Sequence, residues 1–136
     1  MNNNMNKTGK DSNLVSAFQA SDDIVARSSK HYGLLAAWHQ ASETIIVGGE
    51  SKFLRLWDAD KELKVLDIQT GSEFVVSHIS CSPNGIFAVG FGDGCIRVYD
   101  RRNYPHENRI ITYREHSSSL LTVCMRTDCN SLVTGW

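Results

Sequence analysis

The sequence lacks a long hydrophobic run and a strong net charge. No segment approaches the ~18 consecutive apolar residues that a membrane-spanning helix needs. The N-terminal stretch MNNNMNKTGKDSN is polar throughout and has no hydrophobic region of a secretory signal. The net charge of −1 gives no overall field that would attract nucleic acid or anionic lipid. These absences predict a cytoplasmic or nuclear globular protein without membrane insertion or nucleic-acid binding.

The cysteines lack the spacing of a metal or redox motif. Cys81, Cys95, Cys124 and Cys129 include no C-x2-C pair, and the C-x4-C of the last two is a weak zinc signal. The first three lie in apolar strand patterns, in which a free cysteine behaves as a small buried hydrophobe. We therefore predict reduced structural thiols, and neither a metal site nor a cofactor.

Short strand patterns fill the chain from about residue 33 onward. Turn residues separate them, as in Ser82-Pro83-Asn84-Gly85 and Asp93-Gly94. The patterns form two sets of four and one set of two. The expected ranges are 33–40, 44–49, 53–58 and 62–68, then 73–82, 86–92, 95–100 and 109–115, then 119–126 and 131–136.

The second set repeats the first at a shift of 42 residues without a gap. Under this shift Gly48 falls on Gly90, Arg55 on Arg97, Trp57 on Tyr99, and Asp58 on Asp100. A shift of 44 to 45 carries the second set onto the third. A repeat of 40–45 residues with four strands and a Trp-Asp-like ending is typical of a WD40 propeller blade.

The repeat predicts an all-β fold, a partial WD40 β-propeller that forms a fragment of a larger one. We expect two full four-stranded blades, one half blade and one leftover strand. The segments are a disordered polar N-terminus (1–13), the last strand of a preceding blade with a loop (14–32), a blade (33–68), a second blade (73–115) and a truncated blade (119–136). Because a closed propeller needs about 4–8 blades, we expect an open strand edge, and an isolated chain that self-associates or is only partly folded.

Certain repeated residues have predicted structural roles. Alternation puts Ile96 and Val98 on one face of their strand and Arg97 and Tyr99 on the other. An aspartate before the glycine of a tight turn can accept turn backbone N–H groups. The residues assigned to the structural repeat are Trp57, Asp58, Asp93, Gly94, Tyr99, Asp100 and His116.

In WD40 blades the turn aspartate typically joins a hydrogen-bonded network with a histidine, a serine or threonine, and the tryptophan. The second set keeps Asp93 but has Tyr99 in place of tryptophan, no histidine near Gly71, and Val89-Gly90 in place of a hydroxyl. The third set has His116 and Thr134 but no turn or third strand. The network is therefore expected to be incomplete.

No pattern predicts catalysis. The glycine-rich GFGDG lies between two strands, whereas a phosphate-binding loop must open a helix. The histidines are scattered, and the serines beside Cys81 have no recognisable base and orienting group. We therefore predict that the protein has no catalytic residue and is not an enzyme. An enzymatic function would be considered again only if further sequence contained a set of catalytic residues.

The strings KFLRLWDADKELKVLDIQTG, GFGDGCIRVYDRRN and TYREH together resemble the C-terminal propeller of the Raptor family, the regulatory-associated proteins of the TOR kinase. The resemblance covers about residues 14–118 and more loosely extends to Trp136. It implies a non-enzymatic scaffold in nutrient and growth signalling that binds the TOR kinase and its substrates or regulators. It also implies a cytoplasmic location with recruitment to the lysosomal surface.

Four residues outside the WD40 consensus are candidates for partner contacts: Arg101, Arg102, Tyr113 and Arg114. The ending Tyr99–Arg102 also resembles the Trp-Asp-x-Arg box by which some WD40 adaptors dock on cullin-type ubiquitin ligases, which gives the alternative function. Arg102 can equally pair with Asp100 or Glu107 in a structural role.

Overall fold

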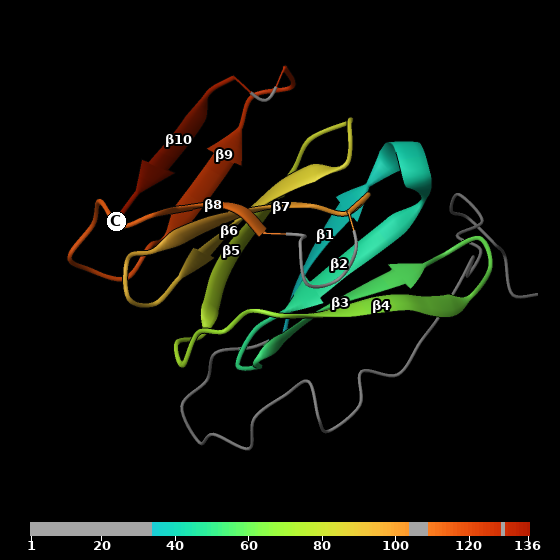
Figure 1. Ribbon diagram of the computed structural model, residues 1–136, viewed down its shortest axis with the longest axis horizontal. Coiled ribbons are helices and arrows are strands. Elements are labelled where there is room, and N and C mark those ends of the chain that lie inside the picture. The colour runs from blue at the N-terminus through green and yellow to red at the C-terminus, as the bar shows by residue number, and fades with distance from the viewer. Residues whose placement is uncertain (1–33, 104–108, 129) are drawn as a thin grey trace, which may run out of the picture.

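The computed structural model describes residues 34–103, 109–128 and 130–136. Within these ranges the chain forms three antiparallel sheets that follow one another in sequence and in space (Figure 1). The only helical element there is a short 3-10 turn, η1 (Gln40–Ser42). The all-β prediction is therefore confirmed. The polar N-terminus and the expected strand near residues 14–18 lie outside the described residues.

Ten strands make up the sheets, each paired with its sequence neighbour. The first sheet contains β1 (Leu35–His39), β2 (Thr44–Gly48), β3 (Phe53–Asp58) and β4 (Leu63–Gln69). The second contains β5 (Val76–Cys81), β6 (Ile86–Phe91), β7 (Ile96–Asp100) and β8 (Arg109–Tyr113). The third contains β9 (Thr122–Met125) and β10 (Leu132–Gly135). Each strand coincides with an expected one, and the ends differ by at most three residues.

The 42-residue repeat extends to the pairing register. Ile45 lies opposite Trp57 in the first sheet, and Phe87 lies opposite Tyr99 in the second, which is the same pair of positions one repeat later. The register between the third and fourth strands shifts after Leu56 in the first sheet and after Val98 in the second. The two four-stranded sheets are therefore copies of one unit, and below we call them the first and second blades.

Consecutive sheets approach each other closely at a repeated glycine. A Cβ atom on Gly48 would lie 2.9 Å from Leu54 Cδ2 and 3.4 Å from both Val76 and Ile79 of the second blade. A Cβ on Gly90, one repeat later, would lie 2.9 Å from Val123 Cγ2 of the third sheet. The glycine gives the first strand of the next sheet room to pack directly against the second strand of the preceding sheet.

A backbone hydrogen bond beside this glycine is repeated as well. The N–H of Val76 donates to the carbonyl of Gly49 at 2.9 Å, and the N–H of Leu120 donates to the carbonyl of Phe91 at 3.4 Å. The first strands β1, β5 and β9 consequently lie in a row, each in contact with the next. Each sheet is thus held to its predecessor at its innermost strand.

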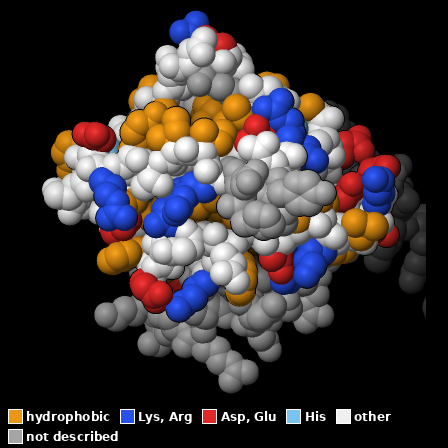
Figure 2. Space-filling view, in the orientation of Figure 1, with side chains coloured by type: hydrophobic (Ala, Val, Ile, Leu, Met, Phe, Trp, Pro, Cys, Tyr) orange, Lys and Arg blue, Asp and Glu red, His pale blue; other side chains and the backbone are white. Residues whose placement is uncertain are grey.

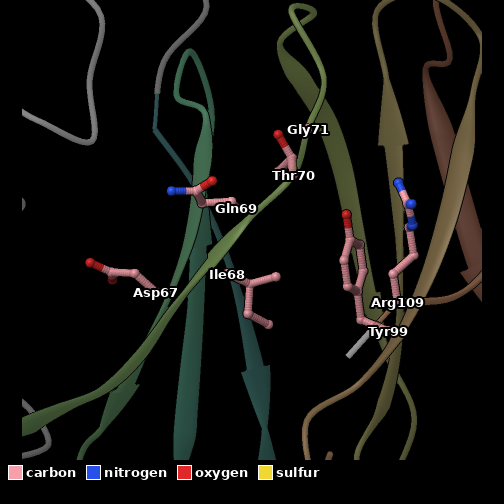
Figure 3. Close-up of a pocket in the computed structure, with 7 residues that line it drawn as sticks. All are labelled: Asp67, Ile68, Gln69, Thr70, Gly71, Tyr99 and Arg109. Atoms are coloured by element: carbon pink, nitrogen blue, oxygen red, sulfur yellow. The ribbon is translucent and has the colours of Figure 1, made fainter. Parts of the chain in front are cut away.

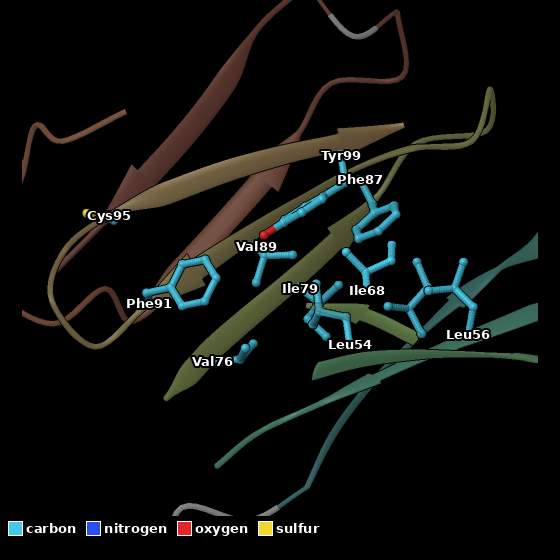
Figure 4. Packing of buried hydrophobic residues seen from close by; sticks show 11 residues of the cluster. Leu54, Leu56, Ile68, Val76, Ile79, Phe87, Val89, Phe91, Cys95 and Tyr99 are labelled. Atoms are coloured by element: carbon cyan, nitrogen blue, oxygen red, sulfur yellow. The ribbon is translucent and has the colours of Figure 1, made fainter. Parts of the chain in front are cut away.

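Two apolar cores fill the spaces between the sheets. The core between the first and second blades is shown in Figure 4, where Leu54, Leu56 and Ile68 of the first blade face the second. Its buried members from the second blade include Val76, Ile79, Phe87, Val89, Phe91, Cys95 and Tyr99. The core between the second blade and the third sheet contains Ala88, Ile96, Val98, Leu120, Val123 and Met125. The opposite faces of β7 therefore belong to different cores, with Ile96 and Val98 on one side and Tyr99 on the other.

The third sheet exposes apolar side chains. Leu121, Val133 and Trp136 are 72%, 67% and 71% exposed, and β10 pairs with β9 alone among the described strands. Self-association through this edge stays a prediction. Separately, no helix in the described part of the chain has the length and apolar character needed to cross a bilayer.

Replacing Gly90 by alanine is expected to destabilise the chain by about 1–3 kcal/mol, because the added methyl group overpacks the contact with Val123. The measurement is the urea midpoint by pulse proteolysis at submicromolar concentration, where self-association is minimised. Gly92→Ala is the matched control, since its Cβ would meet nothing closer than 3.4 Å. Equal midpoints for the two variants would contradict the close-approach argument.

Candidate functional site

The described cysteines and acidic residues do not build a metal or nucleophile site. No group of three His, Cys, Asp or Glu side chains in the described ranges lies close enough to hold a metal ion. Cys95 is buried and Cys81 half-buried, and burial raises the pKa of the Cys81 thiol to about 11, which disfavours the thiolate. Cys124 is exposed, so the expectation of a buried thiol is wrong there because its strand β9 turns that side chain to solvent. Cys129 lies outside the described residues.

The Asp93-Gly94 turn connects β6 to β7. The carboxylate of Asp93 accepts a hydrogen bond from the N–H of Cys95 at 3.0 Å, and Gly94 has a φ of 84°, a conformation that favours glycine. A Cβ on Gly94 would lie 2.3 Å from the carbonyl oxygen of His116 and 2.7 Å from that of Ser118. The turn therefore also seats the segment that leads into the third sheet.

The aspartates that end β3 and β7 both stabilise the turn that follows. Asp58 accepts from the N–H of Lys61 at 2.9 Å. Asp100, which is buried, accepts from the N–H and Nε of Arg102 at 3.0 and 2.9 Å and from its terminal nitrogen at 2.7 Å. The Arg102 guanidinium holds the pKa of the Asp100 carboxyl below its usual value. Arg102 is thus engaged within its own turn, although its side chain is 62% exposed.

The structure does not bring the four candidate partner-contact residues together. Arg101 and Arg102 follow β7 and cover the turn at Gly85, whose carbonyl accepts from the N–H of Arg101 at 3.1 Å. Tyr113 lies at the other end of the hairpin, opposite Ile96, and Arg114 follows it. The two pairs therefore lie at opposite ends of the second blade.

The third sheet contains the histidine–hydroxyl pair that the second blade lacks. The Nε2 atom of His116 lies 2.7 Å from Thr134 Oγ1, and the His116 ring packs against the ring of Trp136 with centroids 4.8 Å apart. The network expected for a WD40 blade is thus partly assembled at β10.

Two polar residues of β5 have a role that the sequence pattern did not indicate. His78 Nδ1 accepts a hydrogen bond from the N–H of Val123 at 3.2 Å, and Ser80 Oγ accepts from the N–H of Met125 at 3.0 Å. These side chains satisfy backbone donors on the inner edge of β9. Their spacing of two residues on one face of a strand was the available signal.

A groove of about 470 Å³ lies between the two four-stranded blades and is the candidate functional site (Figure 3). One wall is formed by the end of β4 and the two residues after it, and the other by β7 and β8. The lining residues are Asp67, Ile68, Gln69, Thr70, Gly71, Tyr99 and Arg109. Among the described residues, both walls of the groove come from the two blades and the segment that follows β4.

Tyr99 occupies the tryptophan position of the repeat and is 1% exposed. Its ring stacks on Phe87 with centroids 5.4 Å apart, while its hydroxyl has no hydrogen-bond partner in the described part of the chain. Burial raises the pKa of this phenol, so it stays protonated and remains a donor. The incomplete WD40 network thus leaves a buried donor at the groove.

The repeated arginines Arg55 and Arg97 differ in their partners. Arg55 makes a two-pronged ion pair with Asp67, at 2.7 and 2.8 Å, and lowers the pKa of that carboxyl. Arg97 lies opposite Thr112 instead, donates to the carbonyl of Thr70 and stacks on the Phe91 ring at 5.0 Å. It is 6% exposed, and its Nε has no partner among the described residues. The second blade therefore holds a buried cation that no carboxylate of the described residues pairs with.

Comparison with known proteins places this chain among WD40 repeat proteins. A family model described as "WD domain, G-beta repeat" matches residues 61–100, which span the end of the first blade and most of the second. A crystal structure of Raptor from Chaetomium thermophilum is similar, with a TM-score of 0.66 and 29% identity over 74% of this chain and 10% of that one. A crystal structure of the Mitotic Checkpoint Complex, at TM-score 0.68 and 20% identity, covers 79% of this chain and 32% of that one and shares the fold. The prediction of a partial WD40 propeller is confirmed.

Several curated relatives are subunits of Target of rapamycin complex 1 or raptor homologs. The chain is 29% identical to the Target of rapamycin complex 1 subunit mip1 of Schizosaccharomyces pombe, over 84% of this chain and 9% of that protein. It is 32% identical to the complex 1 subunit KOG1 of Saccharomyces cerevisiae, over 74% of this chain and 7% of the relative. It is also 32% identical to the raptor homolog of Dictyostelium discoideum, over 82% of this chain and 8% of the relative. The chain thus spans less than a tenth of the length of each of these relatives.

Removing the Tyr99 hydroxyl by Tyr99→Phe is expected to stabilise the chain by about 1 kcal/mol, since a buried donor without a partner is costly. The urea midpoint by pulse proteolysis measures the change. Tyr113→Phe is the control, because Tyr113 is 40% exposed and should shift the midpoint little. A clear loss of stability in Tyr99→Phe would show that the hydroxyl has a partner in the folded chain.

Asp67→Asn is expected to lower the free energy of unfolding by about 2–3 kcal/mol at neutral pH, because it leaves Arg55 buried without a carboxylate. This is less than for a fully buried pair, since the Asp67 side chain is 23% exposed and solvent screens the interaction. The Arg55 guanidinium holds the pKa of Asp67 below its usual value in the folded chain, so the ion pair stabilises the fold at pH values above the ordinary pKa of an aspartate. The difference from the unmodified chain should shrink as the pH falls below about 4. Urea midpoints from pH 7 to pH 3 measure it, with Glu73→Gln in an exposed ion pair as the control. A difference that does not change over this range would refute the assignment.

Proposed function

Since this chain belongs to the Raptor family and corresponds to a segment of its WD40 propeller, we propose that it acts as a non-enzymatic scaffold in a TOR complex. The observation that carries this proposal is the similarity over 74–84% of the chain to three proteins, two of which are named as subunits of Target of rapamycin complex 1. In this role the chain binds protein partners, which include the TOR kinase and its substrates or regulators.

The structural repeat supports a binding role. The polar residues Asp93 and Asp100 accept hydrogen bonds within their own turns. We therefore propose that partners bind to the surface of the loops and to the rim between the blades. The pairs Arg101–Arg102 and Tyr113–Arg114 are proposed contact residues on opposite ends of the second blade.

We further propose a location in the cytoplasm with recruitment to the lysosomal surface through protein partners, as the resemblance to the Raptor family implies. Acidic and basic side chains are interspersed over the face shown in Figure 2, without a single-sign patch. Such a face, like the net charge of −1, does not favour nucleic-acid binding. The proposal therefore assigns recruitment to protein contacts.

The alternative of a cullin-type ubiquitin-ligase adaptor rests on the segment Tyr99–Arg102. In the structure the Arg102 side chain binds Asp100 of its own turn through two hydrogen bonds. That arrangement accounts for the arginine by a structural role, and the relatives named above favour the TOR complex.

Affinity purification of the tagged protein from its native cells, followed by mass spectrometry, tests the proposal. We expect the TOR kinase among the recovered proteins at amounts well above those obtained with an unrelated tagged WD40 protein. Recovery of a cullin adaptor without the TOR kinase, in the same experiment, would replace the proposal by the alternative. Recovery of neither would remove support from both.

A further inference from the structure

One hydrogen bond between the second blade and the third sheet forms only while an imidazole is uncharged. His78 Nδ1 in β5 lies 3.2 Å from the backbone nitrogen of Val123 in β9. A backbone N–H can only donate, so Nδ1 must accept and must itself carry no proton. The ring is therefore the neutral tautomer that carries its proton on Nε2. An imidazolium, which is protonated on both nitrogens, cannot make this bond.

The neighbouring link between the same strands does not depend on charge. Ser80 Oγ accepts a hydrogen bond from the N–H of Met125 at 3.0 Å, two residues further along both strands. A serine hydroxyl neither gains nor loses a proton in the pH range over which histidines titrate. The inner edge of β9 is thus held by one side-chain acceptor that acid removes and by one that acid leaves in place.

The junction between the first and second blades contains a histidine with the opposite requirement. His39, at the end of β1 and 5% exposed, has its Nε2 atom 3.1 Å from the carbonyl oxygen of Pro83. A carbonyl can only accept, so this ring nitrogen must donate. The Nδ1 atom of His39 bonds Ser42 Oγ, which can accept as well as donate. The link from His39 to Pro83 therefore survives protonation of its ring, whereas the link from His78 to Val123 does not.

The strands around His78 offer no charge that would stabilise an imidazolium. β5 contacts β1, β2, β6 and β9, and none of these five strands carries an acidic side chain, a lysine or an arginine. Their titratable side chains are His39, His78, Cys81 and Cys124. Gly90, which lies opposite His78 in the register of β5 and β6, has no side chain at all.

The charged groups of the flanking segments have partners of their own. Glu73, before β5, pairs with Lys52, and Arg126, after β9, pairs with Asp128. Asp93, after β6, accepts from the backbone of its own turn. The remaining charged residues beside these strands are Glu43 and Glu50 at the two ends of β2, and Arg114 and Glu115 before β9. In the described ranges no hydrogen bond or ion pair joins any carboxylate to His78.

We propose that His78 is a pH-sensitive link between the second blade and the third sheet, which loosens when its imidazole takes up a proton. The docked sheet requires a ring without a proton on Nδ1, whereas the undocked sheet tolerates either form. The undocked state therefore binds more protons, and docking weakens as the pH falls. Histidine side chains ordinarily change charge between pH 8 and pH 5, which sets the range of the effect.

The consequence of loosening is confined to one junction. It uncovers the apolar core between the second blade and the third sheet, which includes Ile96, Val98 and Val123. The core between the first and second blades stays closed, because the histidine there keeps its hydrogen bond in acid. The third sheet is thus expected to open before the rest of the described structure does.

Hydrogen–deuterium exchange of the 136-residue chain, measured by mass spectrometry at submicromolar concentration, tests the inference. The measured peptide covers β9 and β10, at pH 7.5 and at pH 5.5, where most carboxylates are still ionised. His78→Asn keeps an acceptor oxygen near the place of Nδ1 and does not titrate. The ratio of exchange rates between the unmodified chain and this variant, taken at each pH, cancels the effect of pH on exchange chemistry.

We expect this ratio to increase at least about fivefold from pH 7.5 to pH 5.5, the size expected for loss of one hydrogen bond. A constant cost of the substitution affects both ratios equally and cancels. For a peptide that covers β2 and β3 of the first blade, the ratio should change by less than about twofold, because its own junction does not respond to acid.

Matched variants separate His78 from the other groups at the junctions. Ser80→Ala removes the acceptor that does not titrate, so it should speed exchange by the same factor at both pH values. His39→Gln and His116→Gln should keep the acid response of the third sheet. The Nε2 atom of His116 lies 2.7 Å from the hydroxyl of Thr134, which pairs with the ring in either charge state.

Four results would overturn the inference. The first is a ratio that does not change between the two pH values. The second is loss of the acid response in His116→Gln, which would assign it to that ring. The third is an equal response in the first-blade peptide, which would indicate a general loosening of the fold. The fourth is complete exchange of β9 and β10 already at pH 7.5, since no docked sheet would then exist. The TOR kinase takes no part in this assay, so either proposal can fail without the other.

Discussion

The close approach of one sheet to the next at a repeated glycine is the constraint on which the rest of the structure depends. A Cβ on Gly90 would lie 2.9 Å from Val123 of the third sheet, whereas one on Gly48 would lie 2.9 Å from Leu54 of its own blade and 3.4 Å from Val76 and Ile79 of the next. At both positions the first strand of the following sheet packs directly against the strand that contains the glycine. The adjacent backbone hydrogen bonds, from Val76 to Gly49 and from Leu120 to Phe91, fix the distance. At the rim the same two sheets are far enough apart to leave a groove. The tight inner contact and the open outer one are two ends of a single packing arrangement.

The sequence alone predicted the strands and their grouping well because both depend on local patterns. The strands predicted from alternation and turn residues are present in the structure. The 42-residue shift also correctly identified Trp57 and Tyr99 as equivalent positions, which have the same strand register in their two blades. The opposite faces of β7 were also correctly assigned, because alternation in a strand leaves no other choice.

The candidate site was harder to predict, since it depends on contacts between residues distant in sequence. The roles of His78 and Ser80 depend on the edge of β9, which lies about 45 residues further along the chain. The separation of Arg101 from Tyr113 follows from the antiparallel course of β7 and β8. The groove needs residues from two blades, and only its buried tyrosine was suggested by an incomplete network. The exposure of Cys124 shows the same limit, because an apolar strand pattern does not reveal which face of a two-stranded sheet is covered.

The side chains of His78 and Ser80 that bind the backbone of β9 give the fold a direction of growth during synthesis. The inner strand β9 finds two acceptors and an apolar face already formed on the second blade. At translation rates of about 5–20 residues per second, one 42-residue unit emerges in about 2–8 s, while a hairpin forms in about 1–10 μs. A completed sheet therefore serves as a template long before the next one leaves the ribosome, and the nascent chain exposes one unfinished edge at a time.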